Sequence, residues 1–364
     1  MRKFFLFALV IGVLGFSIPA MTVSAQESNV IVNGLNNPRG LYYDQNGVLW
    51  ITEAGTGGNM TGQGSLGPIQ YGGTSEIVKV MPGKNVITPV LGGLPSAPDF
   101  DDMIGANSVY ADSDGLWFVT GIGPLADPMV EAAIQLDPKS LRIKQFIDMY
   151  DFENTNNPDK DVIMSDPIDI TKGDDGTYYI LDASGNDLMT WTAKDGLKLF
   201  NVWSDLPVPT GIDIGPNGHI YVSFLSPFPY DPGTARIEEW SADGKLVNTF
   251  GNLTAVTDVQ VGDDGTVYAV QMADGYGDLG FNSNTGSVVK VTADGTTPVA
   301  DKLNYPYRMA IASNGGIAVT VNSAFSPANS GAVIAISGEI PTMSASQLGT
   351  AEAPVSTPEA TAGS

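Results

Sequence analysis

Residues 256–270 read VTDVQVGDDGTVYAV, and the same arrangement occurs six times along the chain. In each copy a turn ends in Gly, and a run of residues suited to a β-strand follows it. The turn glycines are Gly47, Gly115, Gly176, Gly218, Gly265 and Gly315. Six positions before these glycines stand the apolar residues Leu41, Val109, Ile170, Ile212, Val259 and Met309. One register kept over six copies indicates six copies of a single structural unit.

Each unit has room for four short strands, because successive turn glycines are 42 to 68 residues apart. A later apolar run such as Val288–Val291 predicts a third strand, and a short turn such as Asp294-Gly295 leads to a fourth. The sixth unit lacks a fourth strand, whereas Val30–Val32 precedes the first unit. We therefore predict an all-β fold: a six-bladed β-propeller of four-stranded antiparallel blades over residues 26–340, its ring closed by the N-terminal strand. Two β-sandwiches are the alternative, but they do not account for one register repeated six times.

The composition favours a folded, turn-rich protein that does not bind nucleic acids. Gly and Pro contribute 43 and 24 of the 364 residues, and 43% of the residues are apolar. The formal net charge is −23, whereas proteins that bind nucleic-acid phosphates present basic surfaces. The chain contains no Cys, which excludes disulfides, thiol nucleophiles and thiolate metal sites. Residues 341–364 are rich in Thr, Ser, Pro, Ala and Glu, which predicts a disordered tail or a wall spacer.

Residues 1–25 have the pattern of a secretory signal peptide. Arg2 and Lys3 precede the apolar run Phe4–Phe16, and Val23–Ala25 is the small-x-small pattern that a signal peptidase cleaves. An uncleaved membrane anchor is the alternative, but 13 apolar residues are too few to cross about 30 Å of hydrocarbon. No later run is long enough to span a membrane. We therefore expect a secreted or extracytoplasmic protein, at the cell surface or in the envelope, with no membrane span in the mature chain.

Further motifs cover nearly the whole of the expected domain. They are Gly34–Leu41, Thr52–Gly58, Gly93–Ser96, Tyr150–Glu153, Asn157–Asp159, Asp182–Asn186, Val208–Ser223, Phe228-Pro229 and Ala235-Arg236. Together they resemble the ScyD/ScyE family of extracytoplasmic six-bladed propellers, which are related to NHL-repeat propellers. The resemblance implies a propeller fold and a location outside the cytoplasm, and it implies no particular activity.

The lengths of the links between strands predict which face of the ring carries a site. Links from the second to the third strand of a unit, and from one unit to the next, are long, and strand alternation brings them to one face. These links, here named the long-loop face, are residues 55–73, 92–106, 120–130, 148–166, 224–233, 272–285 and 322–330. They carry the aromatic residues Tyr71, Phe100, Tyr150, Phe152, Phe228, Tyr230, Tyr276, Phe281 and Phe325, and the acids Asp99, Asp101, Asp102, Glu153, Asp231, Asp274 and Asp278. Such a face suits a sugar, a pigment or a cationic ligand; alternatively, the aromatic rings only pack within their own loops.

A second set of candidates comes from the expected innermost strands. Residues seven or eight positions before the turn glycines would surround the mouth of the central channel on the long-loop face. They are Arg39, Asn107, Asp169, Thr210, Asp258 and Arg308. The two Arg and two Asp either pair with one another as a plug or orient a polar group of a ligand. Calcium is a candidate cofactor here because it binds Asp and Asn oxygens, although no EF-hand loop is present.

Three other polar residues invite catalytic interpretations that the repeat register disfavours. Glu53 and Asp182 occupy equivalent positions in two units and could form a glycosidase pair, but the other units have no acid there. We expect both to cap the turns that follow them. His219 is the single His and directly follows Gly218, on the face opposite to the long loops. A Ser-His-Asp triad or a His-based zinc site is therefore not expected.

These observations lead to one functional hypothesis and one alternative. We expect a secreted ligand-binding or scaffold propeller that uses its long-loop face, where Phe228 and Tyr230 join the channel-mouth residues as contact candidates. The partner would be a small molecule, an extracellular glycan or a protein. The alternative is a calcium-dependent propeller hydrolase, lactonase-like or phosphoesterase-like, whose metal lies near Asn107, Asp169 and Asp258. The sequence identifies no catalytic residue and leaves open whether the protein is an enzyme.

Overall fold

The described part of the chain is almost entirely β-structure. The computed structural model describes residues 29–99 and 102–338, so the expected signal peptide and C-terminal tail lie outside it. In these residues one short helix, α1 (Met149–Asn156), accompanies the strands, and no helix is long and apolar enough to cross a membrane. The expectation of an all-β protein built from four-stranded antiparallel sheets is confirmed.

Five sheets of the described chain have four antiparallel strands each. In pairing order they are β8 (Ala106–Ala111), β9 (Leu116–Thr120), β10 (Ala132–Leu136) and β11 (Ile143–Asp148); β12 (Pro167–Lys172), β13 (Tyr178–Asp182), β14 (Asp187–Thr192) and β15 (Gly196–Val202); β16 (Pro209–Ile214), β17 (Ile220–Phe224), β18 (Ala235–Trp240) and β19 (Leu246–Leu253); β20 (Val256–Val261), β21 (Val267–Gln271), β24 (Gly286–Thr292) and β25 (Gly295–Leu303); and β26 (Met309–Ile311), β27 (Ile317–Val321), β28 (Gly331–Ser337) and β1 (Asn29–Leu35).

The first unit is larger, because its long links add strands of their own. Its sheet contains β2 (Pro38–Tyr43), β3 (Leu49–Glu53), β5 (Gly67–Val80), β6 (Ile87–Asp99) and β7 (Asp102–Ile104), and β4 (Met60–Gly64) pairs with β5. A small hairpin of β22 (Tyr276–Gly277) and β23 (Gly280–Phe281) lies in a later long link. Several of the predicted long loops are thus partly strands or helix.

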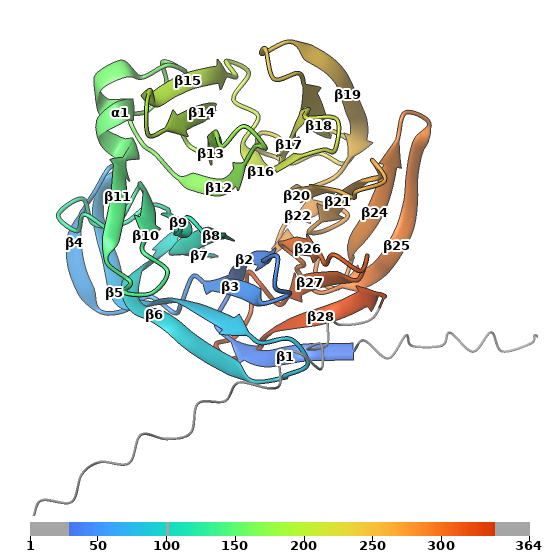
Figure 1. The fold of residues 1–364 in the computed structure, drawn as a ribbon, viewed down its shortest axis with the longest axis horizontal. Coiled ribbons are helices and arrows are strands. Elements are labelled where there is room, and N and C mark those ends of the chain that lie inside the picture. Colours follow the sequence, from blue (N-terminus) through green and yellow to red (C-terminus); the bar gives the residue numbers. More distant parts are fainter. Residues whose placement is uncertain (1–28, 100–101, 339–364) are drawn as a thin grey trace, which may run out of the picture.

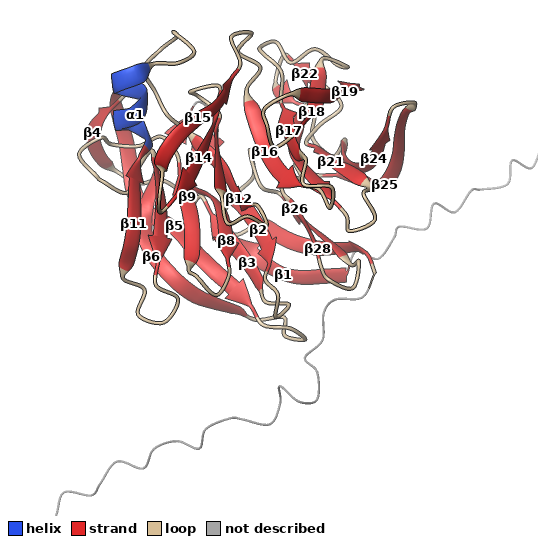
Figure 2. Ribbon diagram, turned by 45° about the horizontal axis from the view of Figure 1, so that its top comes forward, coloured by secondary structure: helices blue, strands red, loops and turns tan. Residues whose placement is uncertain are grey.

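The sheets are arranged around a common centre, with one strand of each sheet innermost (Figure 1). The innermost strands β2, β8, β12, β16, β20 and β26 contact one another in this order, and β26 also contacts β2. After the molecule is tilted, α1, β4 and β22, which all belong to long links, lie along its upper side (Figure 2). The inner strands therefore position side chains at the centre, and the long links gather around it.

The repeated turns form because Gly supplies a backbone conformation that other residues avoid. Gly265 has a φ of 81°, and its N–H donates to the carbonyl oxygen of Gly262 at 2.8 Å. The Asp264 carboxylate accepts from the N–H of Thr266 at 2.9 Å and so closes the turn. The sequence register therefore marks real hairpin turns.

The N-terminal strand pairs with the last strand of the chain. β1 runs antiparallel to β28, with Val30 opposite Ile334 and Val32 opposite Val333. Ile31 and Val32 are 2% and 4% exposed. Strands from the two ends of the described chain thus share one sheet.

Apolar residues pack between neighbouring sheets. Each of six buried clusters combines residues from two adjacent sheets; Ile77 of β5, for example, packs with Phe118 of β9. Outer strands such as β19 are largely exposed. The hydrophobic core therefore lies between the sheets, and the centre of the ring is left to polar side chains.

Candidate functional site

The innermost strands and the residues beside them supply polar side chains at two depths. Residues seven positions before the turn glycines form one buried network, here named the plug: Ser108, Asp169, Asp258 and Arg308. Residues eight positions before them contact long links or line a cavity: Arg39, Asn107, Thr210, Thr257 and Tyr307. Sequence reasoning placed six of these residues in a single ring. The structure separates them into two layers.

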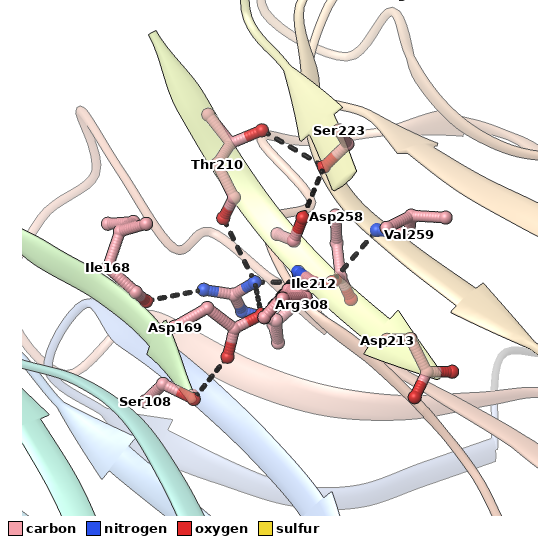
Figure 3. Close-up of polar contacts among 12 residues, drawn as sticks. Ser108, Ile168, Asp169, Thr210, Ile212, Asp213, Ser223, Asp258, Val259 and Arg308 are labelled. Carbon is pink, nitrogen blue, oxygen red and sulfur yellow. Dashed lines mark hydrogen bonds and ion pairs between the residues drawn. The ribbon is translucent and has the colours of Figure 1, made fainter. Parts of the chain in front are cut away.

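Arg308 lies at the centre of the plug (Figure 3). Its Nη1 atom is 2.8 Å from Asp169 Oδ2 and 3.2 Å from Asp258 Oδ1. The same guanidinium donates to the backbone oxygens of Thr210 at 3.1 Å and Ile168 at 2.9 Å. Arg308, Asp169 and Asp258 are 2%, 5% and 0% exposed, so these pairs are shielded from water.

Both carboxylates of the plug have further donors. Asp169 accepts from the Ser108 hydroxyl at 2.6 Å and from the N–H of Ile212 at 2.9 Å. Asp258 accepts from the N–H of Met309 at 2.7 Å. Burial raises the pKa of Asp258, and the charge of Arg308 opposes this shift. The plug is thus internally paired and joins inner strands of several sheets.

The plug does not fit a calcium ion. A divalent cation takes several carboxylate or carbonyl oxygens, but the oxygens of Asp169 and Asp258 already face the guanidinium of Arg308. The described residues also contain no group of three or more His, Asp or Glu side chains arranged to hold a metal. We therefore derive no chemistry through a metal at this point.

The upper layer is tied to the long links. Arg39 pairs with Asp102, and it donates to the backbone oxygen of Met103 at 3.0 Å. Its guanidinium lies 4.3 Å from the centre of the Tyr307 ring. Asn107 donates to Asp166 at 2.9 Å, so it also holds a long link in place.

A cavity of about 780 Å³ opens above the plug, and we name it the aromatic cavity. Its lining residues are Asp102, Thr210, Leu225, Phe228, Tyr230, Thr257, Met272, Tyr276, Leu279, Gly280, Phe281, Tyr305, Tyr307 and Phe325. It brings together Phe228 and Tyr230 with Thr210, three of the residues singled out from the sequence. A volume of this size suits a small ligand.

The aromatic side chains of the cavity contact one another and remain open to solvent. Tyr276 packs on Phe228, Tyr230 and Phe281, with ring centres 4.9 to 5.9 Å apart. Phe228 is 71% exposed, Tyr276 40% and Phe325 39%. Tyr230 and Phe325 have left-handed φ angles of 61° and 51°, which bulky side chains rarely adopt. The aromatic wall is therefore held in a strained backbone conformation at the mouth of the cavity.

The cavity has polar groups among its lining. Thr257 is 2% exposed, and its hydroxyl is buried without a hydrogen-bond partner. Burial raises the pKa of Tyr307, although Arg39 and Arg308 oppose this shift, so its phenol is neutral near pH 7. A second cavity of about 550 Å³ lies next to the first, since Tyr230 lines both.

The remaining polar candidates have structural partners. Glu53 accepts from the N–H of Asn36 at 2.5 Å, and Asp182 accepts from the N–H of Gly185 at 2.8 Å. His219 lies 2.7 Å from Glu239 at the end of β17 opposite to Phe228. Both acids cap turns as expected, and His219 is remote from the aromatic cavity.

Sequence reasoning missed three lining residues: Tyr305, Tyr307 and Thr257. Thr257 and Tyr307 stand eight positions before Gly265 and Gly315, the same place as Thr210 in its own unit. Applying the register to every unit would have found both. Tyr305 lies outside that register; its hydroxyl donates to the backbone oxygen of Phe281 at 2.9 Å.

Comparisons with known proteins agree on the architecture. No protein-family model matches the chain, and no curated protein matches its sequence. Among solved structures, a gluconolactonase from Xanthomonas campestris is similar with a TM-score of 0.54 and 10% identity, over 84% of this chain and 88% of that one. The fold is that of the β-propeller proteins.

Two further propellers are similar to the same extent. The PQQ-bound aldose sugar dehydrogenase from Streptomyces coelicolor has a TM-score of 0.51 and 10% identity, covering 84% of this chain and 96% of that one. A glucose dehydrogenase has a TM-score of 0.51 and 11% identity, covering 85% and 99%. The structural neighbours are propeller enzymes, and at these identities the likeness concerns the fold alone.

Proposed function

We propose that this protein is a secreted six-bladed β-propeller that binds a small ligand in the aromatic cavity of its long-loop face. The observation that carries the proposal is an open aromatic wall around a buried hydroxyl that has no partner. The wall includes Phe228 and Tyr276, and the hydroxyl belongs to Thr257. A ligand with a flat apolar part and a polar group would satisfy both features.

Strand pairing supports the blade count and the closure of the ring. β1 pairs with β28, and the inner strand β26 contacts β2 of the first unit. A propeller closed in this way has no open sheet edge between its first and last blades. The signal-like residues 1–25 support export, and the absence of Cys agrees with it.

The plug supports a binding role because it provides a rigid base. Its buried ion pairs join β12, β16 and β20 to the residue before β26, so the cavity rests on a cross-linked centre. The ligand would be a small molecule or an exposed part of a glycan, because the cavity measures about 780 Å³. The net charge of −23 favours neutral or cationic ligands over anions.

The test is a screen of the full chain against oligosaccharides and aromatic small molecules, followed by calorimetry with any compound that binds. Phe228→Ala and Tyr276→Ala should weaken binding at least about tenfold, which corresponds to about 1.4 kcal/mol. Because Phe228 is 71% exposed, its replacement should leave the melting temperature unchanged. Arg39 and Asp258 are poor probes, since both are buried in ion pairs.

His219→Ala serves as the matched control, because this side chain lies at the opposite end of β17. It should leave binding unchanged. A binding defect found in His219→Ala and absent from both aromatic variants would reject the long-loop face as the site.

A hydrolase is the second candidate, and the shared fold with a gluconolactonase favours it. The proposal is less well supported because Arg308 occupies the carboxylates that would hold a metal. Hydrolysis of a lactone panel, measured after EDTA treatment and again with added CaCl2, tests it. Calcium-dependent turnover that Asp258→Asn abolishes would favour the enzyme over the binding protein.

A further inference from the structure

A second group of buried polar atoms lies away from the plug, where helix α1 packs on the rim of the ring (Figure 1). Met149, at the start of α1, joins the apolar cluster between two neighbouring sheets. Glu153 lies one turn later and is only 2% exposed. An acid therefore occupies a position on the buried side of the helix, where an apolar residue is the usual choice.

Glu153 is matched by a second buried acid, Asp187 at the start of β14. Asp187 is also 2% exposed. One oxygen of each, Glu153 Oε1 and Asp187 Oδ1, is buried without a hydrogen-bond partner. A buried carboxylate oxygen without a donor costs free energy, so two of them in one region call for an explanation.

The electrostatics of this region lack a positive charge. Burial, followed by the charges of Asp159 and Asp182, raises the pKa of Glu153 to about 7. Burial and the charges of Asp182, Glu153 and Asp159 raise the pKa of Asp187 well above its usual value. In the described chain, none of these four acids forms an ion pair with Lys, Arg or His.

A third oxygen joins the two carboxylates. Asn157 is the C-cap of α1, and its N–H donates to the backbone oxygen of Glu153 at 2.8 Å. Its side-chain N–H donates to the backbone oxygen of Asp161 at 2.9 Å, which orients the amide. The other end of that amide, Oδ1, is buried and has no partner.

The loop after α1 is fixed against the turn that leads into β14. Asp159 accepts from the side-chain amide of Asn186 at 3.1 Å, and Asn186 directly precedes Asp187. The end of the helix, with Glu153 and Asn157, is therefore held beside the start of the strand that carries Asp187.

We propose that Glu153, Asn157 and Asp187 bind a calcium ion between the end of α1 and the start of β14. Calcium takes carboxylate and amide oxygens, and it tolerates water in its remaining positions. The site uses two carboxylates and one amide, and the region offers no His or Cys that would favour zinc or copper. It is separate from the plug and from the aromatic cavity, and it does not depend on the proposed ligand.

A proton shared by the two carboxylates is the competing account. One proton would satisfy Glu153 and Asp187, but it would leave the Asn157 oxygen buried without a donor. A cation satisfies all three oxygens and also compensates the nearby charges of Asp159 and Asp182. The bound ion would fasten α1 to the rim of the ring.

The experiment compares calcium-free and calcium-loaded full chain. After EDTA treatment and dialysis, CaCl2 should raise the melting temperature by a few degrees in a saturable manner. Dissociation constants of extracellular calcium modules are on the order of 10⁻⁴ to 10⁻³ M, so the titration should reach about 10 mM. Calorimetry should give one ion per chain.

Three variants with the same change in net charge separate a site from general binding to an acidic surface. Glu153→Gln and Asp187→Asn should abolish the saturable response, whereas Asp263→Asn, in an exposed turn, should keep it. Without calcium, Asp187→Asn should melt at or above the wild-type temperature, because it removes a repelling charge.

Two results would overturn the site. One is an unchanged melting temperature and no heat of binding at 10 mM CaCl2. The other is an equal response of Asp187→Asn and Asp263→Asn, which would mean diffuse binding to the acidic surface. A failure of ligand binding in the aromatic cavity would leave this test unaffected, because it measures calcium and needs no ligand.

Discussion

Replacing Arg308 with Met removes the guanidinium at the centre of the plug and keeps a long side chain in its place. The Asp169 and Asp258 carboxylates lose their counter-ion at 2.8 Å and 3.2 Å. The backbone oxygens of Ile168 and Thr210 lose donors at 2.9 Å and 3.1 Å. All these atoms lie in a part of the molecule that is almost closed to water.

The expected loss of stability is large because the carboxylates stay buried. Removing one partner of a buried ion pair costs about 3–5 kcal/mol, mostly from the charge that is left behind. Arg308 compensates two carboxylates, which are 5% and 0% exposed, and no water reaches them easily. The backbone donors that both acids retain limit the damage. We therefore expect Arg308→Met to lower the free energy of unfolding by about 4–5 kcal/mol, in the upper half of that range.

Urea unfolding followed by tryptophan fluorescence measures this change, since the chain has five Trp. Lys198→Met is the control, because its ion pair with Asp195 is exposed and should contribute less than about 1 kcal/mol. Adding Asp258→Asn to Arg308→Met removes one uncompensated charge, so the double variant should be more stable than Arg308→Met alone.

The pH dependence gives an independent check. Without Arg308, burial alone acts on Asp258 and holds its folded-state pKa above the unfolded value. The folded state then binds more protons, so the stability of Arg308→Met should recover as the pH falls from 7 to 5. A loss smaller than about 1 kcal/mol, or a double variant less stable than the single one, would refute the account of the plug.

Three further predictions use other parts of the chain. Burial raises the pKa of Glu131 to about 8 and that of Asp213 to about 7, so the folded state binds extra protons; the melting temperature should fall as the pH rises from 5 to 8, and a rising profile would contradict this. Deleting residues 26–33 removes most of β1, including two buried apolar side chains worth about 1.5–3 kcal/mol each; a melting temperature within a degree or two of the intact chain would disprove the role of this strand. Gly40→Ala would place a Cβ 2.8 Å from the backbone of Ser108 and cost about 1–3 kcal/mol by urea unfolding, whereas Gly251→Ala, with open space around it, should be neutral and serves as the control.

The layout of strands and turns was readable from the sequence because it depends on neighbouring residues. A turn such as Gly262–Gly265 closes through its own backbone and the Asp264 side chain. The strand after it, β21, has the β-branched and aromatic residues that suit a pleated surface. These signals are local, so six copies in one register were enough to predict four-stranded antiparallel sheets.

The candidate site was predicted only in part. The register brought Arg308, Asp169 and Asp258 to the centre, and the long links suggested Phe228 and Tyr230. It did not separate two depths, although adjacent residues of a strand alternate in direction. That alternation puts Asp169 in the plug and Thr210, one register position away in its own unit, at the aromatic cavity.

The partners themselves were decided by the tertiary structure alone. Arg308 and Asp169 are 139 positions apart in the chain, and nothing near either residue specifies the other. They meet because the sheets are arranged around one centre, which brings inner strands from distant units together. Packing of separate links likewise assembled the aromatic cavity and the oxygens of Glu153, Asn157 and Asp187. Local sequence determines the conformation of each strand and turn, whereas a site made from several units exists only after their long-range packing has formed.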